Sequence, residues 1–316
     1  SYSKEQFVKD IISGIIVAII ALPLSIALAL ASGVGPEQGL YTAIVAGFII
    51  SFLGGSRVQI AGPTAAFASI VAGIVATSGM DGLIVATVLA GIILVLMGVL
   101  RLGNLIKFIP YTITTGFTFG IAVTIAIGQV KDFLGLTFST SPIETIEKAE
   151  EIVRSIGTLN PMAFAVGIFS LAILIIWPKF KALDKIPPSL IAVIAASALV
   201  KVLNLNVNTI GDLYTISSAL PKITLPVVNF GIVKTALPDA FTIAVLAAVE
   251  SLLSCVVSDG MIGDRHNSNM ELIAQGAGNI GSALFGGIPA TGAIARTAAN
   301  IKNGGRSPIA GMVHAI

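Results

Sequence analysis

Charged residues, aromatic residues and cysteine are all scarce in this chain of 316 residues. Asp, Glu, Lys and Arg make up 11% of the sequence and aromatic residues 6%, whereas 55% of the residues are hydrophobic and the mean hydropathy is +0.97. A soluble domain carries roughly 25% charged residues because water must wet its surface. The shortage of charge therefore excludes an ordinary soluble domain, and the surplus of apolar residues must face a lipid bilayer. A net charge of +2 gives no sign of a nucleic-acid partner.

The sequence also has little that could support catalysis. The single cysteine, Cys255, excludes a disulfide framework and a thiolate metal site. Residues 276–281 match the pattern GxGxxG, but no βαβ unit surrounds them, so dinucleotide binding is not expected. His266 lies in a polar turn and is expected to be a loop residue, and no pair of nucleophile and base stands out. We predict no catalytic residue, no metal site and no enzyme activity.

Apolar stretches of about 20 residues, the length that crosses a bilayer as a helix, recur along the chain. We predict an all-α membrane protein with about ten segments, which lie near residues 10–31, 39–54, 58–77, 83–100, 108–130, 162–178, 187–204, 235–257, 271–286 and 290–302. Most Lys and Arg residues between segments lie on the side of the N-terminus. The positive-inside rule therefore predicts a multi-pass protein of the cell inner (plasma) membrane with a cytoplasmic N-terminus.

Two longer connections interrupt the apolar segments. Residues 131–160 contain Ser141-Pro142, which predicts the start of a short amphipathic helix on the outer surface. Residues 205–233 are rich in β-branched residues and predict an extended outer loop. A third feature, the GxxxG pair Gly116 and Gly120, predicts a helix-packing face.

One pattern occurs twice. The second segment ends in Gly54-Gly55, and Pro63 then precedes the small residues that begin the next segment. The ninth segment ends in Gly286-Gly287, and Pro289 precedes the small residues that begin the tenth segment. Such breaks are tolerated at membrane depth only where the backbone is buried in protein or lines a cavity. Paired interruptions in the two halves of a transporter indicate its binding site. Two helices that begin there would direct free N–H groups and positive dipole ends at one place, which attracts an anion.

Two charged residues lie inside apolar segments rather than at their ends. Glu250 is in the eighth segment, and Arg296 follows the second break. A charge at the bilayer centre costs about 2.5–3.5 kcal/mol on insertion scales, so it usually marks a transport pathway or a relay. Glu250 and Ser254 share a helix face and could offer oxygens to a proton or a cation. The alternative is that Glu250 and Arg296 only neutralise each other.

These residues resemble those of the sulfate permease (SulP) family of anion transporters, bacterial type. The resemblance extends over essentially the whole chain. The stretches that carry it are 21–23, 39–43, 60–66, 250–254, 263–271, 287–297 and 303–306.

The resemblance implies a fold of fourteen segments built as two inverted repeats of seven, with two broken half-helices that meet at the midplane. It further implies a core domain that moves against a gate domain, a homodimer, and a cytoplasmic STAS domain after the membrane region. In this chain the core would comprise about residues 10–130 and 235–316, and the gate about residues 131–234. We expect residues 1–316 to be an incomplete transmembrane domain, truncated to about ten segments, with the STAS domain absent.

The resemblance also assigns candidate site residues. Those that match the substrate contacts of the third and tenth segments are Thr64, Ala65, Ala66, Gly292, Ala293, Ile294 and Arg296. Glu250 and Ser254 match the positions that bind the coupling ion. Sodium-coupled bicarbonate members have aspartate in place of Glu250 and threonine in place of Ser254. Proton-coupled sulfate members tend to have glutamate at the position of Glu250. Leu24 departs from animal relatives, which often have glutamine there.

The leading hypothesis is therefore proton-coupled symport of a small anion by an elevator-like movement. Sulfate is the first choice of substrate, followed by bicarbonate and dicarboxylates. Sodium-coupled bicarbonate symport, a nucleobase permease of related fold, a passive anion channel and a membrane scaffold are the alternatives. The expected partners are the anion, the lipid bilayer and a second copy of the chain, and no cofactor is expected apart from Na+ as the alternative coupling ion.

Overall fold

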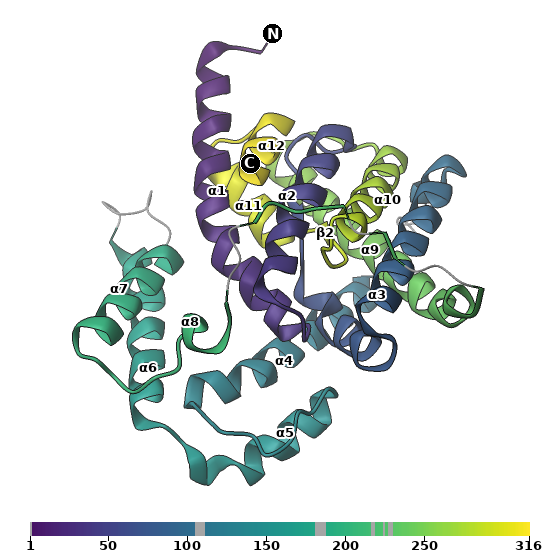
Figure 1. The fold of residues 1–316 in the computed structure, drawn as a ribbon. Coiled ribbons are helices and arrows are strands. Elements are labelled where there is room, and N and C mark those ends of the chain that lie inside the picture. Colours follow the sequence, from purple (N-terminus) through teal and green to yellow (C-terminus); the bar gives the residue numbers. More distant parts are fainter. Residues whose placement is uncertain (1, 105–110, 181–187, 216–218, 224, 227–229) are drawn as a thin grey trace. The chain divides into compact units, whose positions relative to one another are not determined.

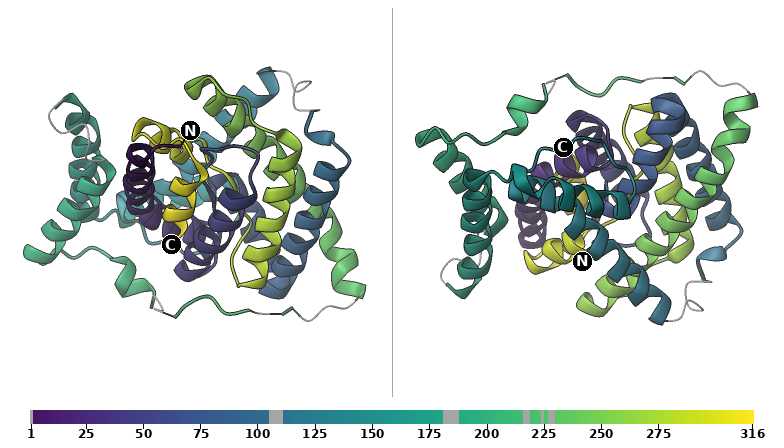
Figure 2. Two further views of the ribbon diagram at one scale, coloured as in Figure 1. Left: turned by 90° about the horizontal axis from the view of Figure 1, so that it is seen from above. Right: turned by 90° about the horizontal axis from the view of Figure 1, so that it is seen from below.

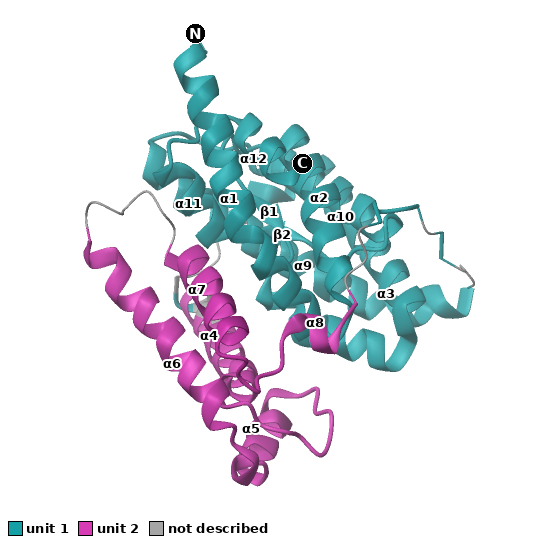
Figure 3. Ribbon diagram, turned by 60° about the vertical axis from the view of Figure 1, so that its left-hand side comes forward, with its two compact units in different colours: residues 1–113, 217–316 teal, residues 114–216 magenta. Residues whose placement is uncertain are grey.

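The computed structural model describes residues 2–104, 111–180, 188–215, 219–223, 225–226 and 230–316. The chain divides into two compact units, which consist of residues 1–113 with 217–316 and of residues 114–216 (Figure 3). Both units are built almost entirely of helices, which confirms the prediction of an all-α protein.

Unit 1 contains the two ends of the chain and forms a helical bundle around one short strand pair (Figure 1). Its elements are α1 (Lys4–Ala31), α2 (Pro36–Leu53), β1 (Ala61–Gly62), η1 (Ala65–Phe67), α3 (Ala68–Val99), α9 (Phe230–Ile262), α10 (Ser268–Leu284), β2 (Thr291–Gly292), α11 (Ile294–Lys302) and α12 (Pro308–Ala315). Unit 2 and the segment that leads into it contain α4 (Tyr111–Leu134), α5 (Thr145–Arg154), η3 (Ile156–Thr158), α6 (Pro161–Ile176), η4 (Trp177–Lys179), α7 (Pro188–Val202) and α8 (Ile210–Leu213).

Five helices in the described part of the chain are long and apolar enough to cross a membrane. They are Lys4–Ala31, Pro36–Leu53, Ala65–Val99, Pro161–Lys179 and Phe230–Ile262. The third of them contains a break at Gly79, whose backbone is not helical (φ 67°, ψ −171°), and this break separates the third predicted segment from the fourth. The ninth and tenth predicted segments correspond to shorter helices, α10 and α11, because both belong to the second interrupted region. The first residues of the fifth predicted segment, 108–110, lie outside the described residues.

Glycines allow α10 to pack closely against α2 and α3. Figure 2 shows α10, in yellow-green, alongside α3, in blue. A Cβ atom at Gly276 would lie 2.5 Å from the Gly91 carbonyl oxygen of α3, and one at Gly278 would lie 2.5 Å from the Ile50 side chain of α2. The residues of the GxGxxG match therefore form a helix-packing surface, which the sequence did not predict.

We expect Gly276→Ala to destabilise the protein by about 3 kcal/mol, since overpacking costs roughly 1–3 kcal/mol and here the obstacle is backbone. Thermal unfolding in detergent would measure the loss. Gly260→Ala in α9 is the matched control, because a Cβ atom there meets nothing within 4 Å. Equal melting temperatures for the two variants would contradict the packing argument.

Three predictions about unit 2 and its flanks need correction. The amphipathic helix α5 begins at Thr145, not near Ser141, because Glu144 and Glu147 form the capping box. The loop 205–233 contains the short helix α8. The predicted packing face at Gly116 and Gly120 is exposed, and no described atom lies within 4 Å of a Cβ atom built at either glycine.

The Glu151 carboxylate in α5 is fixed by hydrogen bonds. Glu151 Oε1 accepts hydrogen bonds from the Ser139 hydroxyl (2.7 Å) and the Ser139 backbone N–H (2.8 Å). These bonds lower the pKa of Glu151 to about 2. They join α5 to the segment that follows α4 while Ile146 and Val153 on the other face stay exposed.

Candidate functional site

The two interrupted regions meet in unit 1 as an antiparallel strand pair (Figure 3). Ala61 pairs with Gly292 and Gly62 with Thr291. The Ala293 N–H also donates to the Ile60 carbonyl oxygen at 2.8 Å. Sequence segments about 230 residues apart are thus joined through their backbones at one place, which we call the crossing (residues 58–67 and 289–297).

The helices on either side of the crossing begin later than predicted. Residues after Pro63 form η1 and then α3 from Ala68, and α11 begins at Ile294 rather than near residue 290. Residues 60–62 and 291–293 are extended instead, because their backbones pair across the crossing. This pairing removes backbone groups from a site where lipid could not satisfy them.

Both helix starts at the crossing lack a side-chain cap. The side chain of neither Thr64, which precedes η1, nor Ala293, which precedes α11, accepts a hydrogen bond from the helix that follows it. By contrast, Ser3, Asn160, Asn267 and Ser307 cap α1, α6, α10 and α12. The first N–H groups of a helix have no partner within it. The two uncapped starts therefore leave donors near the crossing for another acceptor.

Arg296 belongs to the crossing and is almost fully buried, with 2% of its surface exposed. Its Nη2 atom donates to the Pro63 carbonyl oxygen. Its Nε and Nη1 atoms have no hydrogen-bond partner among the described residues. Gly62 makes room for the guanidinium, since a Cβ atom there would lie 2.6 Å from Nη1. A buried cation thus keeps two donor atoms unused.

Glu250 contacts the first interrupted region. The Thr64 hydroxyl donates to Glu250 Oε2 at 2.9 Å, which joins α9 to the residue before η1. Glu250 and Arg296 form no direct ion pair, since the four ion pairs between described residues lie elsewhere. Their charges still interact at longer range, so the alternative in which these two residues only neutralise each other stays a hypothesis.

The other candidate residues differ in exposure. Ala65 and Ala66 are half-buried, Gly292 and Ala293 are buried, and Ile294 is exposed. Ser254 lies one turn beyond Glu250 in α9, buried, with no partner for its hydroxyl oxygen among the described residues. The crossing thus brings Thr64, Glu250, Gly292 and Ala293 together, whereas no hydrogen bond between described side chains links Ser254 to it.

Several polar residues that support the crossing were missed by sequence reasoning. The Ile60 N–H donates to Thr297 Oγ1 (3.0 Å), Asn300 Nδ2 donates to the Val58 carbonyl (2.9 Å), and the Thr291 hydroxyl donates to the Ala247 carbonyl (3.1 Å). Gln59 and Glu271 are two further buried polar residues that support the crossing and were not predicted. A polar residue inside an apolar segment was the available signal.

A serine–histidine–aspartate chain was also missed. His266 Nδ1 lies 2.7 Å from Asp259 Oδ2, and the Ser268 hydroxyl lies 2.9 Å from His266 Nε2. The backbone N–H of His266 donates to the same carboxylate oxygen of Asp259 (3.1 Å). These hydrogen bonds together close the turn between α9 and α10. His266 is a loop residue, as predicted, and its partners hold the turn.

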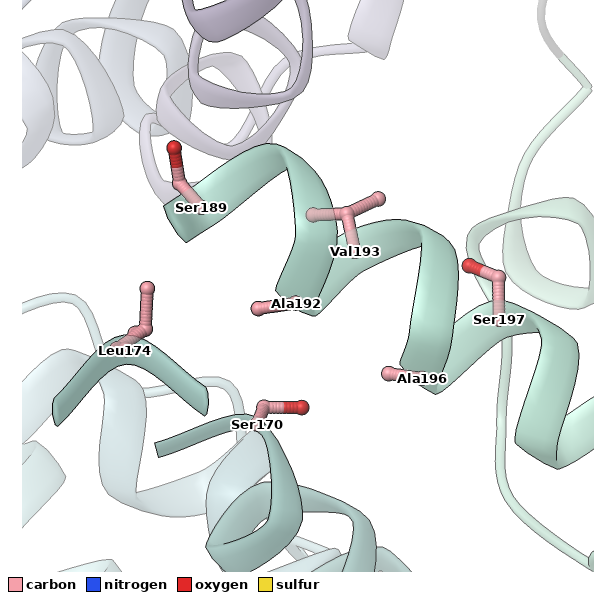
Figure 4. Close-up of a pocket in the computed structure, with 7 residues that line it drawn as sticks. All are labelled: Ser170, Leu174, Ser189, Ala192, Val193, Ala196 and Ser197. Carbon is pink, nitrogen blue, oxygen red and sulfur yellow. The ribbon is translucent and has the colours of Figure 1, made fainter. Parts of the chain in front are cut away.

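Unit 2 contains a hollow that none of the candidate site residues lines. It is an open groove of about 400 Å³ between α6 and α7 (Figure 4). Its lining is Ser170, Leu174, Ser189, Ala192, Val193, Ala196 and Ser197. Small residues and hydroxyls suit close helix packing, and the groove carries no charged group.

A helical membrane domain in which two uncapped helix starts and a buried arginine meet at one crossing is the architecture of an inverted-repeat transporter. The sequence profile of the sulfate permease family matches residues 7–316, so the chain belongs to this family. This is the family that the resemblance indicated, and its members are transporters rather than enzymes.

Individual relatives agree with this assignment. The chain is 43% identical to a putative sulfate transporter, YvdB, of Bacillus subtilis (strain 168), over 100% of this chain and 59% of the relative. It is 32% identical to the bicarbonate transporter BicA of Picosynechococcus sp. (strain ATCC 27264 / PCC 7002 / PR-6), over 97% of this chain and 55% of the relative. The chain therefore spans somewhat more than half the length of these relatives.

Solved structures share the fold. The transmembrane domain of a cyanobacterial bicarbonate transporter BicA superposes with a TM-score of 0.86 at 30% identity, over 99% of this chain and 82% of that chain. The structure of SLC26A9 matches with a TM-score of 0.83 at 21% identity, over 99% of this chain and 53% of that chain. The predicted inverted-repeat fold is confirmed.

Proposed function

We propose that the protein to which this chain belongs is a secondary active transporter of a small anion, with sulfate as the first choice. The observation that carries this proposal is Arg296, a buried cation with two unused donor atoms at a crossing that also holds two uncapped helix starts. Charged donors and helix N-termini both favour an anion. A nucleobase would instead require a carboxylate in this position to accept its N–H groups.

We propose proton coupling through Glu250. Its carboxyl group touches Thr64, so a change in its protonation changes the charge next to the first helix start. Thr64, Ala65 and Ala66 from one side and Gly292, Ala293 and Ile294 from the other would contact the anion. In this proposal the core segments move as one body against the gate segments in an elevator-like step, which carries the crossing between the two sides of the membrane.

Uptake of radiolabelled sulfate tests the proposal. The complete protein would be reconstituted in proteoliposomes, and uptake measured with and without an inward proton gradient. We expect accumulation above equilibrium only with the gradient. Failure to take up sulfate, bicarbonate or a dicarboxylate under any gradient would refute anion transport.

Sodium-coupled bicarbonate symport is the second candidate. Relatives named as bicarbonate transporters are 32% identical to the chain, and the buried Ser254 hydroxyl has no partner among the described residues. Such a hydroxyl oxygen suits a small cation. The same proteoliposomes distinguish the candidates, since bicarbonate uptake that follows a sodium gradient and ignores a proton gradient would favour this one.

We further propose that the protein lies in the inner (plasma) membrane with its N-terminus in the cytoplasm. A homodimer is the proposed assembly. The relatives are longer than this chain, and their additional residues would supply the remaining segments and part of the dimer interface.

A further inference from the structure

Gln59 occupies a junction between three elements. It lies two residues before β1 and is buried. Its Nε2 atom donates to the Ser251 carbonyl oxygen of α9 (3.1 Å) and to Glu271 Oε1 of α10 (3.1 Å). A primary amide has two N–H donors, so both donors of Gln59 are used and the plane of its side-chain amide is fixed.

The same side chain lies against the backbone of β2. A Cβ atom built at Gly292 would overlap the Gln59 amide group. The Gln59 amide therefore lies between the Gly292 backbone and α9 and fixes the distance between them. Because Ser251 follows Glu250 directly, the hydrogen bond to Ser251 fixes α9 next to the residue that binds Thr64.

Glu271 sets the position of Gln59. This carboxylate is fully buried, with 0% of its surface exposed, and no cation pairs with it among the described residues. Its Oε2 accepts the Gly55 N–H (2.9 Å) and the Ser56 N–H (3.2 Å). Its Oε1 accepts Gln59 Nε2 (3.1 Å) and Gln275 Nε2 (2.9 Å). Four N–H donors satisfy both oxygens and attach the segment before β1 to α10.

We propose that Gln59 is a positioning residue of the crossing, oriented by Glu271. Its hydrogen bonds to α9 and α10 and its contact with Gly292 fix where β2 lies relative to these two helices. The first N–H groups of α11, which follows β2, are thereby held at a fixed distance from Thr64 and Glu250. This inference rests on the proposed function, since it assigns the crossing as the anion site. Gln59 itself touches no substrate in this scheme.

Gln59→Met and Gln275→Met form a matched pair that tests the proposal. Methionine is unbranched and of similar length, and each variant removes one N–H donor from the same oxygen, Glu271 Oε1. Only the Gln59 variant also loses the bond to Ser251. In sulfate uptake by the complete protein, we expect Gln59→Met to raise KM about tenfold with Vmax within about threefold, and Gln275→Met to leave both within about threefold. Equal KM values in the two variants would overturn the proposal.

Hydrogen exchange gives a second measurement that needs no anion. The Ala293 amide, which is bonded to Ile60, should exchange about tenfold faster in Gln59→Met than in Gln275→Met. Equal exchange in the two variants would overturn the proposal, even if sulfate, bicarbonate and dicarboxylate uptake all fail and the proposed function falls. If Gln59→Met does not fold, Gln59→Asn, which shortens the side chain but keeps the amide, carries the same expectation for exchange.

Discussion

Replacement of Arg296 by glutamine is expected to lower kcat/KM for sulfate uptake by about 100-fold. A hydrogen bond to a charged group contributes about 1.5–3 kcal/mol, and each 1.4 kcal/mol is a factor of ten. The two unused donor atoms of Arg296 would supply one or two such bonds to the anion. Arg296→Lys keeps the charge but loses the planar fork of donors, so an intermediate loss is expected.

Lys302→Gln is the control for the Arg296 variants. Lys302 lies in the same helix, α11, and carries the same charge, but its side chain is exposed. Since Arg296 also bonds to the Pro63 carbonyl oxygen, folding must be monitored by thermal unfolding and size-exclusion chromatography. Folded Arg296→Gln protein that transports sulfate within about threefold of the unchanged protein would refute the role of Arg296, because the loss of even one charged hydrogen bond should exceed that limit.

Replacement of Glu250 by glutamine is expected to abolish accumulation of sulfate against its gradient. Glutamine retains an oxygen that can accept the hydrogen bond from Thr64, so the substitution removes the ionisable group while the contact is conserved. Exchange of labelled for unlabelled sulfate across the membrane should continue within about tenfold, because exchange does not require net movement of a proton. Accumulation and exchange can be measured in the same proteoliposomes.

Asp239→Asn is the control for Glu250→Gln. Both carboxylates belong to α9, and they are separated by eleven residues, or about 16 Å along the helix axis. Gradient-driven accumulation should survive in the Asp239 variant. The Glu250 variant also separates a transporter from a passive channel, since sulfate conductance that persists unchanged in Glu250→Gln would favour the channel.

The features that the sequence predicted well depend on local patterns. Apolar length predicted the helices that cross the membrane, and the repeated Gly-Gly and proline breaks predicted two interrupted regions. Charges inside apolar segments directed attention to Glu250 and Arg296. Each of these signals is contained in a few neighbouring residues, so no knowledge of distant contacts was needed.

The features that the sequence did not predict depend on distant contacts. The extended pairing of Ala61 with Gly292 requires two segments to meet, and neither segment has a strand pattern of its own. The role of Glu271 depends on donors from residues 55–59, and the Asp259–His266–Ser268 chain depends on the geometry of one turn. The start of α5 was misplaced because Glu144 is a less common cap than Ser141.

The strand pair at the crossing also constrains biosynthesis. The polar backbone groups of residues 58–60 find their partners in Ala293, Thr297 and Asn300, which the ribosome adds more than 230 residues later. Until then, a nascent chain that has already inserted α2 and α3 carries unsatisfied donors and acceptors into the membrane, at a cost of several kcal/mol for each group that meets hydrocarbon. The early helices must therefore remain sheltered by the insertion machinery, or hydrated, until α11 arrives. The crossing can therefore be completed only after α11 has been synthesised.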